Sequence, residues 1–363
     1  MFTLQSTNKD IRRGIVHTPH GNFATPAFMP IATRGSVKHL TPLELKTLGA
    51  EIILSNTYHL FQRPGLEVLK KQKGLHAFMG WDGPILTDSG GYQVFSLSKM
   101  RKLSDDGVTF QSEIDGSRIH LTPESVIDAQ LTIGSDIIMV LDECPPWPCD
   151  RAYAKKSLDL TLSWAARSKA HFEKRMRQKK ISPSKRPLLF GIVQGSTFKD
   201  LREISAKSLV EIGFDGYAIG GLAVGEPPVK RLKALEWSIS HLPADKPRYM
   251  MGVGRPEDIV AAVKRGVDMF DCVIPTREAR HGRLYISKNK PSEKVFYAAI
   301  NIKSEVYKND DRPLDKNCPC QSCFTVSRAY LRHLFSVGEP LACRLATVHN
   351  LHFYLKLMRS LQK

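Results

Sequence analysis

The chain has 363 residues, and its 53 lysines and arginines exceed its 36 aspartates and glutamates, which gives a formal net charge of +17. A chain of this length can bury a large core, so we expect one large domain, alone or with a small appendage. The charge excess implies a polyanionic partner, most simply a nucleic acid, and the alternative is a generally basic protein.

The sequence pattern gives no sign of a membrane or a secreted protein. The first residues, MFTLQSTNKDIRRG, lack the apolar stretch of a secretory signal, and no apolar run approaches the length of a membrane span. The seven cysteines form an odd count without even spacing. We therefore expect a cytoplasmic protein with no membrane partner, whose thiols are metal ligands or free.

Eight short apolar runs recur along the chain. Each is too short for a helix and too uniformly apolar for a half-exposed strand, which is typical of strands buried on both faces. The runs are Phe28–Ala32, Glu51–Asn56, Pro84–Asp88, Ile137–Glu143, Leu188–Gly195, Tyr217–Gly221, Tyr249–Gly254 and Met269–Val273.

Helix signals lie between most of these runs. Thr122-Pro123-Glu124 reads as an N-cap, a proline in the first turn and an acidic first turn, and similar patterns begin at Thr41 and Arg255. Eight buried strands with crossover helices predict an α/β fold, a (β/α)8 or TIM barrel. A doubly wound open sheet is the alternative, although the chain carries no Rossmann glycine fingerprint.

Polar residues and glycines cluster where the predicted strands end. Barrel enzymes place their active sites at the carboxyl ends of the strands. An aspartate at a strand end is often only a helix N-cap, but three of them beside glycine-rich loops make that reading unlikely for all three. The strand-end residues are Asn56, Asp88, Asp142, Gln194, Gly220, Gly252 and Asp271.

A cysteine cluster near the carboxyl terminus predicts a metal site. Cys318, Cys320, Cys323 and His349 supply three thiolates and one imidazole, which fill a tetrahedral Zn²⁺ shell and leave no open position, so the site would be structural. His333 and His352 compete for the fourth position, and we expect His349 at the head of the last helix. The alternative is a reduced cluster without a metal.

These features divide the chain into three parts. We expect a barrel with an amino-terminal extension over residues 1–273, an inserted zinc-binding module over 274–345, and a final helix over 346–363 that completes the barrel. No solenoid period or low-complexity tract is present.

Several long motifs, in order, resemble one family. They are TDSGGYQVFS from Thr87, DECPPWP from Asp142, GIVQGS from Gly191, GYAIGGLAVGE from Gly216, MGVGRPED from Met251, MFDCVIPTREARHG from Met269, and the cysteine cluster with HNL. Together they resemble bacterial queuine tRNA-ribosyltransferases, the tRNA-guanine transglycosylases, over nearly the whole chain. That family folds as a (β/α)8 barrel with an inserted zinc module, in agreement with the reading above.

The resemblance implies a pentosyltransferase that works in queuosine biosynthesis. Such an enzyme exchanges guanine at the wobble position of tRNAs with a GUN anticodon for a 7-deazaguanine, through a covalent enzyme–RNA intermediate. By the same resemblance Asp271 is the nucleophile at C1′, and Asp88 is the proton donor and acceptor. A carboxylate opposite the leaving base suits an oxocarbenium-like transition state.

The resemblance also implies how the base is held. Asp142 would accept hydrogen bonds from guanine, Gln194 and the backbone around Gly221 and Leu222 would hold the carbonyl oxygen, and Tyr92 and Met251 would sandwich the ring. Asn56 and His59 would orient Asp88. The loop residues Ser89, Gly90 and Gly91 complete the expected base pocket.

Two further segments are expected to contact tRNA. Arg255, Arg277 and Arg280 can pair with phosphates or uracils of the anticodon loop, and the alternative is surface salt bridges to Glu257 and Glu278. The expected RNA-binding residues are Gly252, Val253, Gly254, Arg255, Pro256, Glu257, Asp258, Thr276, Arg277, Glu278, Ala279 and Arg280. Arg202, by contrast, is expected on the far side of the barrel, away from RNA.

The family further implies a homodimer supported by the zinc module and the last helix. Val224 would fill the space that a bulky cyclopentenediol needs, which favours 7-aminomethyl-7-deazaguanine over queuine as the incoming base. Two other hypotheses are a catalytically silent tRNA-binding subunit and a zinc-dependent purine hydrolase. Cys149 lies near the expected pocket mouth without a role.

Overall fold

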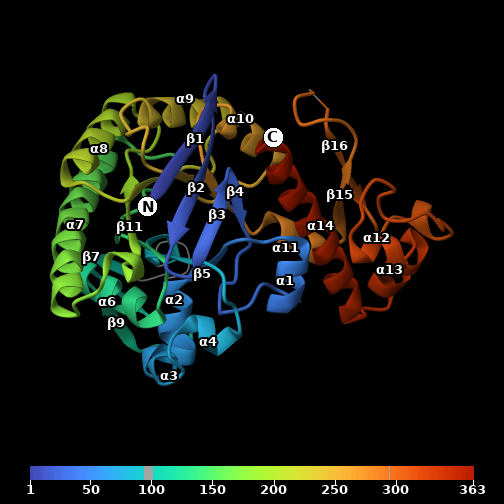
Figure 1. Ribbon diagram of the computed structural model, residues 1–363, viewed down its shortest axis with the longest axis horizontal. Helices are drawn as coiled ribbons and strands as arrows, with labels where there is room; N and C mark the ends of the chain where they lie inside the picture. Colours follow the sequence, from blue (N-terminus) through green and yellow to red (C-terminus); the bar gives the residue numbers. More distant parts are fainter. Residues whose placement is uncertain (94–100, 294) are drawn as a thin grey trace.

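The eight predicted strands form one parallel sheet that closes into a barrel (Figure 1). The structure is a computed structural model that describes residues 1–93, 101–293 and 295–363, so the last residues of the motif that begins at Thr87 lie outside the described part. The strands are β4 (Ala27–Met29), β5 (Ile53–Asn56), β6 (Ile85–Asp88), β10 (Ile137–Met139), β11 (Leu188–Val193), β12 (Gly216–Ile219), β13 (Arg248–Met250) and β14 (Met269–Asp271).

The order of the strands around the sheet is β4-β14-β13-β12-β11-β10-β6-β5, and every pair of neighbours is parallel. The two ends of this order meet just past β4, where Leu54 N donates to Pro30 O at 3.0 Å and Ala32 N donates to Leu54 O at 2.6 Å. The (β/α)8 prediction is therefore confirmed, and the open-sheet alternative is wrong.

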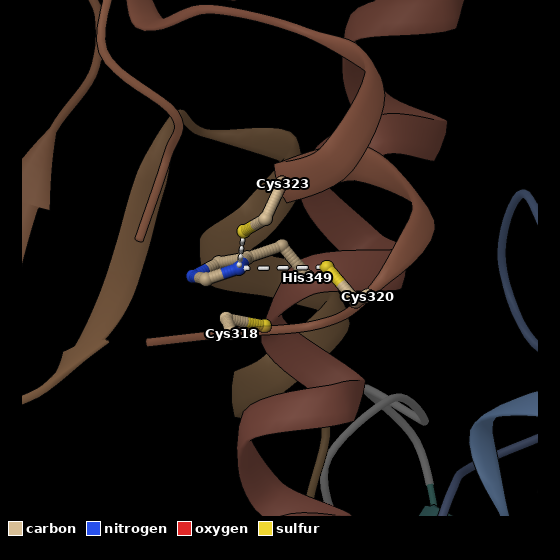
Figure 2. A group of neighbouring side chains, drawn as sticks. All are labelled: Cys318, Cys320, Cys323 and His349. Atoms are coloured by element: carbon tan, nitrogen blue, oxygen red, sulfur yellow. Dashed lines mark hydrogen bonds between the residues drawn. The ribbon is translucent and has the colours of Figure 1, made fainter. Parts of the chain in front are cut away.

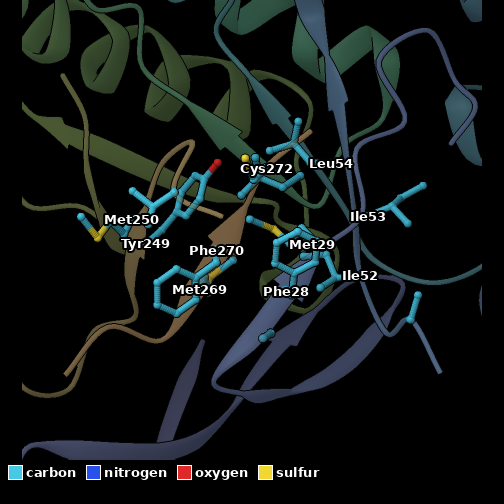
Figure 3. Close-up of a cluster of buried hydrophobic side chains, with 14 of the residues drawn as sticks. Phe28, Met29, Ile52, Ile53, Leu54, Tyr249, Met250, Met269, Phe270 and Cys272 are labelled. Carbon is cyan, nitrogen blue, oxygen red and sulfur yellow. The ribbon is translucent and has the colours of Figure 1, made fainter. Parts of the chain in front are cut away.

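Burial on both faces explains why the sequence signal was clear. All six residues of β11 are buried, as are all residues of β5, β6 and β14. Figure 3 shows part of this interior, where Phe28 and Met29 of β4 pack beside Met269 and Phe270 of β14. Strands with no exposed face carry no polar alternation, which is what the apolar runs indicated.

Crossover helices surround the barrel. Thr41 caps the first of them in a capping box with Glu44, and Thr122 caps another in the same way with Ser125. Arg255 precedes a helix as predicted, but its side chain makes no capping hydrogen bond. The main helices are α1 (Pro42–Leu48), α6 (Pro123–Ile133), α7 (Arg151–Gln178), α8 (Lys199–Ile212), α9 (Pro228–Ile239), α10 (Pro256–Val263), α11 (Ile274–Arg280) and α14 (Pro340–Leu361).

Short helices fill the connections. Between β5 and β6 the chain forms α2 (Thr57–Leu60), η1 (Phe61–Gly65), α3 (Leu66–Lys71) and α4 (Leu75–Met79). The others are η2 (Pro183–Lys185), η3 (Glu305–Tyr307), α12 (Gln321–Thr325) and α13 (Arg328–Ser336).

Three antiparallel sheets were not predicted. The strands β1 (Phe2–Asn8), β2 (Ile11–Thr18) and β3 (Gly21–Thr25) form one of them, and Arg12 of β2 reaches Asp268 just before β14. This sheet therefore covers the amino-terminal end of the barrel. The other two are β7 (Arg101–Leu103), β8 (Val108–Gln111) and β9 (Arg118–Leu121), and the hairpin of β15 (Arg283–Ser287) and β16 (Tyr297–Asn301). The strands β7, β8 and β9 alternate between buried or partly buried and exposed residues, whereas β15 is buried over Leu284, Tyr285 and Ile286.

The carboxyl-terminal module lies beside the barrel, with α14 between them (Figure 1). Helix α14 begins at Pro340, so it is longer than expected, and His349 lies in its interior. The expectation that His349 stands at the head of the last helix is therefore wrong. The division of the chain at residues 273 and 345 stays a prediction. None of the described helices is both long enough and apolar enough to cross a membrane.

Candidate active site

The carboxyl ends of the strands surround a cavity of about 680 Å³. Asp88 ends β6, Asp271 ends β14, and Asp142 follows β10, and all three carboxylates line this cavity. Each residue is less than a tenth exposed. Three buried carboxylates that share one cavity are costly to ionise together, so this arrangement indicates a functional site.

Asp88 is held from the neighbouring strand β5 and from its own loop. Its Oδ1 accepts from the backbone N of Thr57 at 3.2 Å, and its Oδ2 accepts from Asn56 Nδ2 and from Gln93 Nε2. Burial raises the pKa of Asp88 to about 8, and the nearby Asp271 and Asp142 add to the rise. Near neutral pH this carboxyl group therefore carries a proton that it can donate.

Asp142 is fixed by two side-chain donors. Ser89 Oγ donates to its Oδ1 at 3.3 Å, and Gln194 Nε2 donates to its Oδ2 at 2.7 Å. Burial raises the pKa of Asp142 to about 6, and the two donors oppose that rise. A Cβ on Gly91 would lie 2.5 Å from the carbonyl oxygen of Asp142, so only glycine fits beside it.

Asp271 is held by one of its two oxygens. Tyr249 Oη donates to Oδ1 at 2.6 Å, and the backbone N of Gly252 donates to the same oxygen at 2.8 Å. In the part of the chain that the structure describes, Oδ2 has no hydrogen-bond donor. Burial raises the pKa of Asp271 above its usual range, while the hydrogen bonds from Gly252 and Tyr249 oppose that rise.

The structure brings most of the predicted base-pocket residues to this cavity. Asn56 contacts Asp88 directly, whereas no hydrogen bond joins the His59 ring to Asp88 among the described residues. Gln194 is fully buried behind Asp142 and does not line the cavity. The predicted residues that do line it are Asp88, Ser89, Gly90, Gly91, Tyr92, Asp142, Gly221, Leu222 and Met251.

The predicted RNA-binding segments divide into two groups. Gly252, Val253, Gly254, Arg255, Asp258 and Arg277 line the cavity. Pro256, Glu257, Thr276, Glu278, Ala279 and Arg280 do not, and the side chains of Pro256, Thr276 and Ala279 are buried.

The salt-bridge alternative does not describe the predicted arginines. Glu257 accepts from Tyr297 Oη at 2.6 Å, and Glu278 lies 3.4 Å from Arg283. Within residues 1–93, 101–293 and 295–363, no salt bridge involves Arg255, Arg277 or Arg280.

Sequence reasoning missed several residues that shape the cavity. Glu226 accepts from the backbone N of Ala223 at 2.6 Å and of Val224 at 3.0 Å, and Arg231 then joins Glu226 to Asp258. This chain of contacts fixes the loop after β12. The GLAVGE motif contained Glu226, but nothing in its spacing indicated that its side chain folds back onto its own loop.

Arg202 is the largest departure from expectation, because the residue is fully buried beneath the cavity. Its guanidinium donates to the carbonyl oxygens of Val193, Ser196 and Gly220, and at longer range to that of Gly221. The expectation that Arg202 lies on the far side of the barrel is wrong. The position of Arg202 in a helix after the Gln194 loop could not reveal the four carbonyl oxygens that its side chain reaches.

Cys149 lies close to the same loops. Its Sγ is 3.6 Å from Ser196 Oγ, and the side chain is partly buried. It does not line the cavity, and the structure gives it no further role.

The predicted metal ligands come together beside α14, as Figure 2 shows. The Sγ atoms of Cys318, Cys320 and Cys323 and a ring nitrogen of His349 all lie within 4.8 Å of one another, so this group could hold a metal ion. His349 Nε2 lies 2.8 Å from Tyr285 O, while Nδ1 faces Cys323 Sγ at 3.2 Å. A backbone acceptor on one ring nitrogen leaves the other free as a ligand, as is usual for metal-binding histidines.

The two competing histidines lie differently. His352 Nδ1 is 3.2 Å from Cys318 Sγ, so this residue borders the cluster. His333 belongs to α13 and is not part of the group.

Comparisons with known proteins identify the family. The profile of the family described as queuine tRNA-ribosyltransferase matches residues 7–363. A queuine tRNA-ribosyltransferase of Histophilus somni is 50% identical over all of this chain and 93% of its own length. Those of Caldanaerobacter subterraneus and Vibrio vulnificus are 52% and 49% identical, covering 97% and 100% of this chain and 89% and 91% of their own. The chain therefore belongs to the queuine tRNA-ribosyltransferase family.

Proposed function

We propose that this protein exchanges guanine at the wobble position of GUN-anticodon tRNAs for 7-aminomethyl-7-deazaguanine. The observation that carries the proposal is the cavity with three buried carboxylates at the carboxyl end of a barrel of this family. Two displacements at C1′ of the ribose need a nucleophile, a group that moves protons and a group that recognises the base, and the three aspartates suit these roles.

Asp271 is the proposed nucleophile. Oδ1 is occupied by Tyr249 and Gly252, which leaves Oδ2 to attack C1′. The bond from C1′ to the guanine nitrogen breaks as the bond to Oδ2 forms, and the incoming base later displaces Oδ2. Because both displacements invert C1′, the product keeps the original configuration.

Asp88 is the proposed proton donor and acceptor. Its pKa of about 8 supports a protonated carboxyl group near neutral pH, which can donate its proton to the departing guanine. The resulting carboxylate can then accept a proton from the incoming base, so one group serves both half-reactions. Asn56 and Gln93 keep Oδ2 in place during this cycle.

Asp142 is the proposed base-recognition group. As a carboxylate it can accept from the N1–H and the exocyclic amine of guanine, a pair of donors that adenine does not present at the same edge. Ser89 and Gln194 fix its orientation. Tyr92 and Met251 both line the cavity, which supports their proposed stacking on the base.

Arg255 and Arg277 are the proposed contacts to the anticodon loop at the cavity mouth. Both are exposed and both line the cavity, and the net charge of +17 suits a polyanionic substrate. The predicted residues outside the cavity would act through the positions of two helices, Pro256 and Glu257 through α10 and Thr276, Glu278, Ala279 and Arg280 through α11. Because tRNA is the substrate, we place the protein in the cytoplasm.

The cysteine cluster is proposed to hold one structural Zn²⁺ per chain, and the module around it to support a homodimer. Three thiols and an imidazole whose second nitrogen is hydrogen-bonded to the backbone fit zinc, which would tie α12 to α14.

We expect Cys320→Ala to lose the metal and, with it, several kcal/mol of stability, because metal-binding energy is folding energy in such modules. Elemental analysis that still finds one zinc per chain in this variant would contradict the ligand set.

An exchange assay tests the function. tRNA that carries radiolabelled guanine at the wobble position is incubated with the protein and unlabelled 7-aminomethyl-7-deazaguanine. Release of label that requires the second base supports exchange. Tight tRNA binding without release would indicate a silent subunit, and base loss or deamination without a second base would indicate a hydrolase.

Queuine is the second candidate for the incoming base. Val224 lines the cavity and restricts the space beside the base, which favours the smaller aminomethyl compound. A competition assay with both bases decides between them, and preferred incorporation of queuine would overturn the assignment. A Val224→Gly variant should shift the preference toward queuine, because the change removes the side chain that limits the space.

A further inference from the structure

Arg202 is a buried cation with no carboxylate partner among the described residues. It belongs to α8, is fully buried, and takes part in no salt bridge with any described residue. Its four hydrogen bonds go to backbone carbonyl oxygens instead. Nε donates to Ser196 O at 2.7 Å, one Nη donates to Gly220 O at 2.8 Å and to Val193 O at 3.1 Å, and the other approaches Gly221 O at 3.4 Å.

These acceptors lie on two neighbouring loops of the cavity. Val193 and Ser196 flank the end of β11, while Gly220 and Gly221 follow β12. One side chain thus joins the loop of Gln194 to the loop that begins at Gly220. Burying a guanidinium costs several kcal/mol, so a fully buried arginine that only ties carbonyls together calls for a functional explanation.

Peptide geometry supplies that explanation. In a trans peptide the carbonyl of one residue and the N–H of the next point in opposite directions. When Gly220 O and Gly221 O turn toward Arg202, the N–H groups of Gly221 and Leu222 turn away from it. Gly220, Gly221 and Leu222 all line the cavity, so these two N–H groups face the space that the base would occupy.

The two N–H groups also lack other partners. Among the described residues neither the N–H of Gly221 nor that of Leu222 donates to a protein acceptor, whereas the next two, of Ala223 and Val224, donate to Glu226. Gly221 has a φ of +62°, and a Cβ there would lie 2.2 Å from Gln194 Oε1. The turn is thus restricted to glycine and held in a conformation that keeps two donors free.

We propose that Arg202 is a positioning residue that aims the N–H groups of Gly221 and Leu222 at the carbonyl oxygen of the purine base. Its positive charge lies behind both peptides and strengthens them as donors to an oxygen that gains negative charge as the base departs. This inference rests on the proposed function, because it needs a purine with a carbonyl group in the cavity.

The role differs from simple structural support in one measurable way, the selectivity between two bases. Guanine has the carbonyl oxygen, whereas 2-aminopurine lacks both this oxygen and the N1–H that is the proposed donor to Asp142, and Arg202 contacts neither Asp142 nor its two donors. Replacement of Arg202 should weaken guanine about 10- to 100-fold as a competitive inhibitor of exchange, since two aimed donors are lost. Binding of 2-aminopurine should change less than about 3-fold. A defect that only loosens the fold would weaken both bases alike.

Arg248 offers a matched control. It is partly buried, and its guanidinium donates to the carbonyl oxygens of Leu242 and Pro243, but it is the first residue of β13 and so lies at the opposite end of the barrel. Burial lowers the pKa of both arginines to about 10, so both remain charged near neutral pH. Arg248→Lys should therefore affect stability without changing the ratio of the two inhibition constants.

The experiment measures inhibition by guanine and by 2-aminopurine for the wild type, Arg202→Met, Arg202→Lys and Arg248→Lys. Arg202→Lys keeps the charge but loses the fork of donors, and it serves if Arg202→Met does not fold. A guanine-to-2-aminopurine ratio that falls in the Arg202 variants and stays constant in Arg248→Lys supports the proposal. Equal weakening of both bases, or the same change in the ratio in Arg248→Lys, overturns it.

Two further results distinguish a failure of the proposed exchange function from a failure of the proposed role of Arg202. If the wild type neither exchanges nor binds guanine, the proposed function fails, whatever the variants do. If neither Arg202 variant folds, the wild-type Arg202 Nε–H signal is followed by nuclear magnetic resonance. A shift with guanine that 2-aminopurine does not reproduce supports the proposal, and the same response to both bases overturns it.

Discussion

Both ends of the barrel bury aspartates, but the pKa of the buried carboxyl group is raised at one end and lowered at the other. At the carboxyl end Asp88 receives donors from neutral groups only, and its pKa is raised to about 8. At the amino end Asp136, just before β10, receives His20 Nδ1 at 2.8 Å, His76 Nε2 at 3.1 Å and the backbone N of Ile85 at 2.8 Å. Hydrogen bonds from the two histidines and Ile85 outweigh burial and hold the pKa of Asp136 at about 2.

The difference shows that the hydrogen-bond partners of a buried aspartate, rather than its burial, decide whether it can exchange a proton or serves only a structural role. The rings of His20 and His76 are stacked, with 3.7 Å between their centroids and 19° between their planes, and each faces one oxygen of Asp136. The ligand atoms of the three residues lie within 4.8 Å of one another, and each ring nitrogen is within hydrogen-bond distance of its own Asp136 oxygen. Asp136 ties the β2–β3 turn and α4 to the barrel, whereas Asp88 remains able to exchange a proton.

The sharpest test of this comparison uses one isosteric change at each end. Asp271→Asn should lower the rate of exchange by roughly 10³-fold or more, because no other group supplies the covalent bond to C1′. tRNA binding should stay nearly intact, since the side chain keeps its shape. Rates of base release and tRNA affinities, measured together, check this result.

Asp136→Asn is the matched control at the opposite end. It should leave the exchange rate of the folded protein nearly unchanged. A covalent protein–RNA adduct that survives denaturant in Asp271→Asn would contradict the nucleophile assignment.

Replacement of Asp136, at the amino end of the barrel, should lower the unfolding free energy by an amount that depends on pH. In the folded protein Asp136 has a pKa of about 2, below its usual value of 3.8, so its contribution is complete above pH 4 and is lost as the pH falls toward 2. Asp136→Asn should therefore cost roughly 2–3 kcal/mol of unfolding free energy at pH 7 and much less near pH 2. Urea unfolding at both pH values measures the difference. A constant cost across this range would mean that the carboxylate charge is not what the histidines stabilise.

Replacement of Asp88, at the carboxyl end of the barrel, should instead raise the unfolding free energy. Asp88 keeps its proton in the folded protein up to about pH 8 but loses it near pH 4 when unfolded, so its burial destabilises the protein increasingly as the pH rises from 4 to 8. Asp88→Asn removes this titration. The variant should gain stability relative to the wild type, by about 1 kcal/mol or more between pH 5 and pH 8. Unfolding curves at these two pH values test it, and a gain that falls with rising pH would contradict the assignment.

The sequence predicted the strand-end carboxylates and the metal group better than it predicted what surrounds them. Asp88, Asp142 and Asp271 were found because buried parallel strands give apolar runs whose carboxyl-terminal ends are easily located. Cys318, Cys320 and Cys323 were found because their spacing is local. The contacts of Asp136 with His20 and His76 could not be found, since they join three segments that are distant in the chain.

The same reason explains the misplacement of Arg202. Its position in α8 fits an amphipathic helix, and the four carbonyl oxygens that it contacts are contributed by two loops. A helical pattern indicates which face is buried but not whether a long polar side chain finds acceptors there. The half-exposed antiparallel strands β7, β8 and β9 were missed because three- and four-residue strands carry too few positions to show alternation.

The smallest expected effect is on tRNA affinity, when one arginine charge is removed from either end of the barrel. If Arg277 at the cavity mouth contacts the anticodon loop, Arg277→Ala should weaken tRNA binding a few-fold at low salt. The slope of log K against log salt should fall by about one unit, because one phosphate contact is lost. The loss should therefore shrink as salt rises. Exchange on enzyme already loaded with tRNA should suffer less, since Asp88 and Asp142 remain.

Arg177 provides the control for this charge. It is exposed in the last turn of α7, the helix whose end leads through η2 to the start of β11, and so lies toward the amino ends of the strands, away from the cavity. Arg202→Ala cannot serve, because that residue is buried under the base pocket. Arg177→Ala removes the same charge and should change neither tRNA affinity nor its salt dependence. Equal salt slopes for the wild type, Arg277→Ala and Arg177→Ala would mean that RNA does not lie at the carboxyl end of the barrel near Arg277.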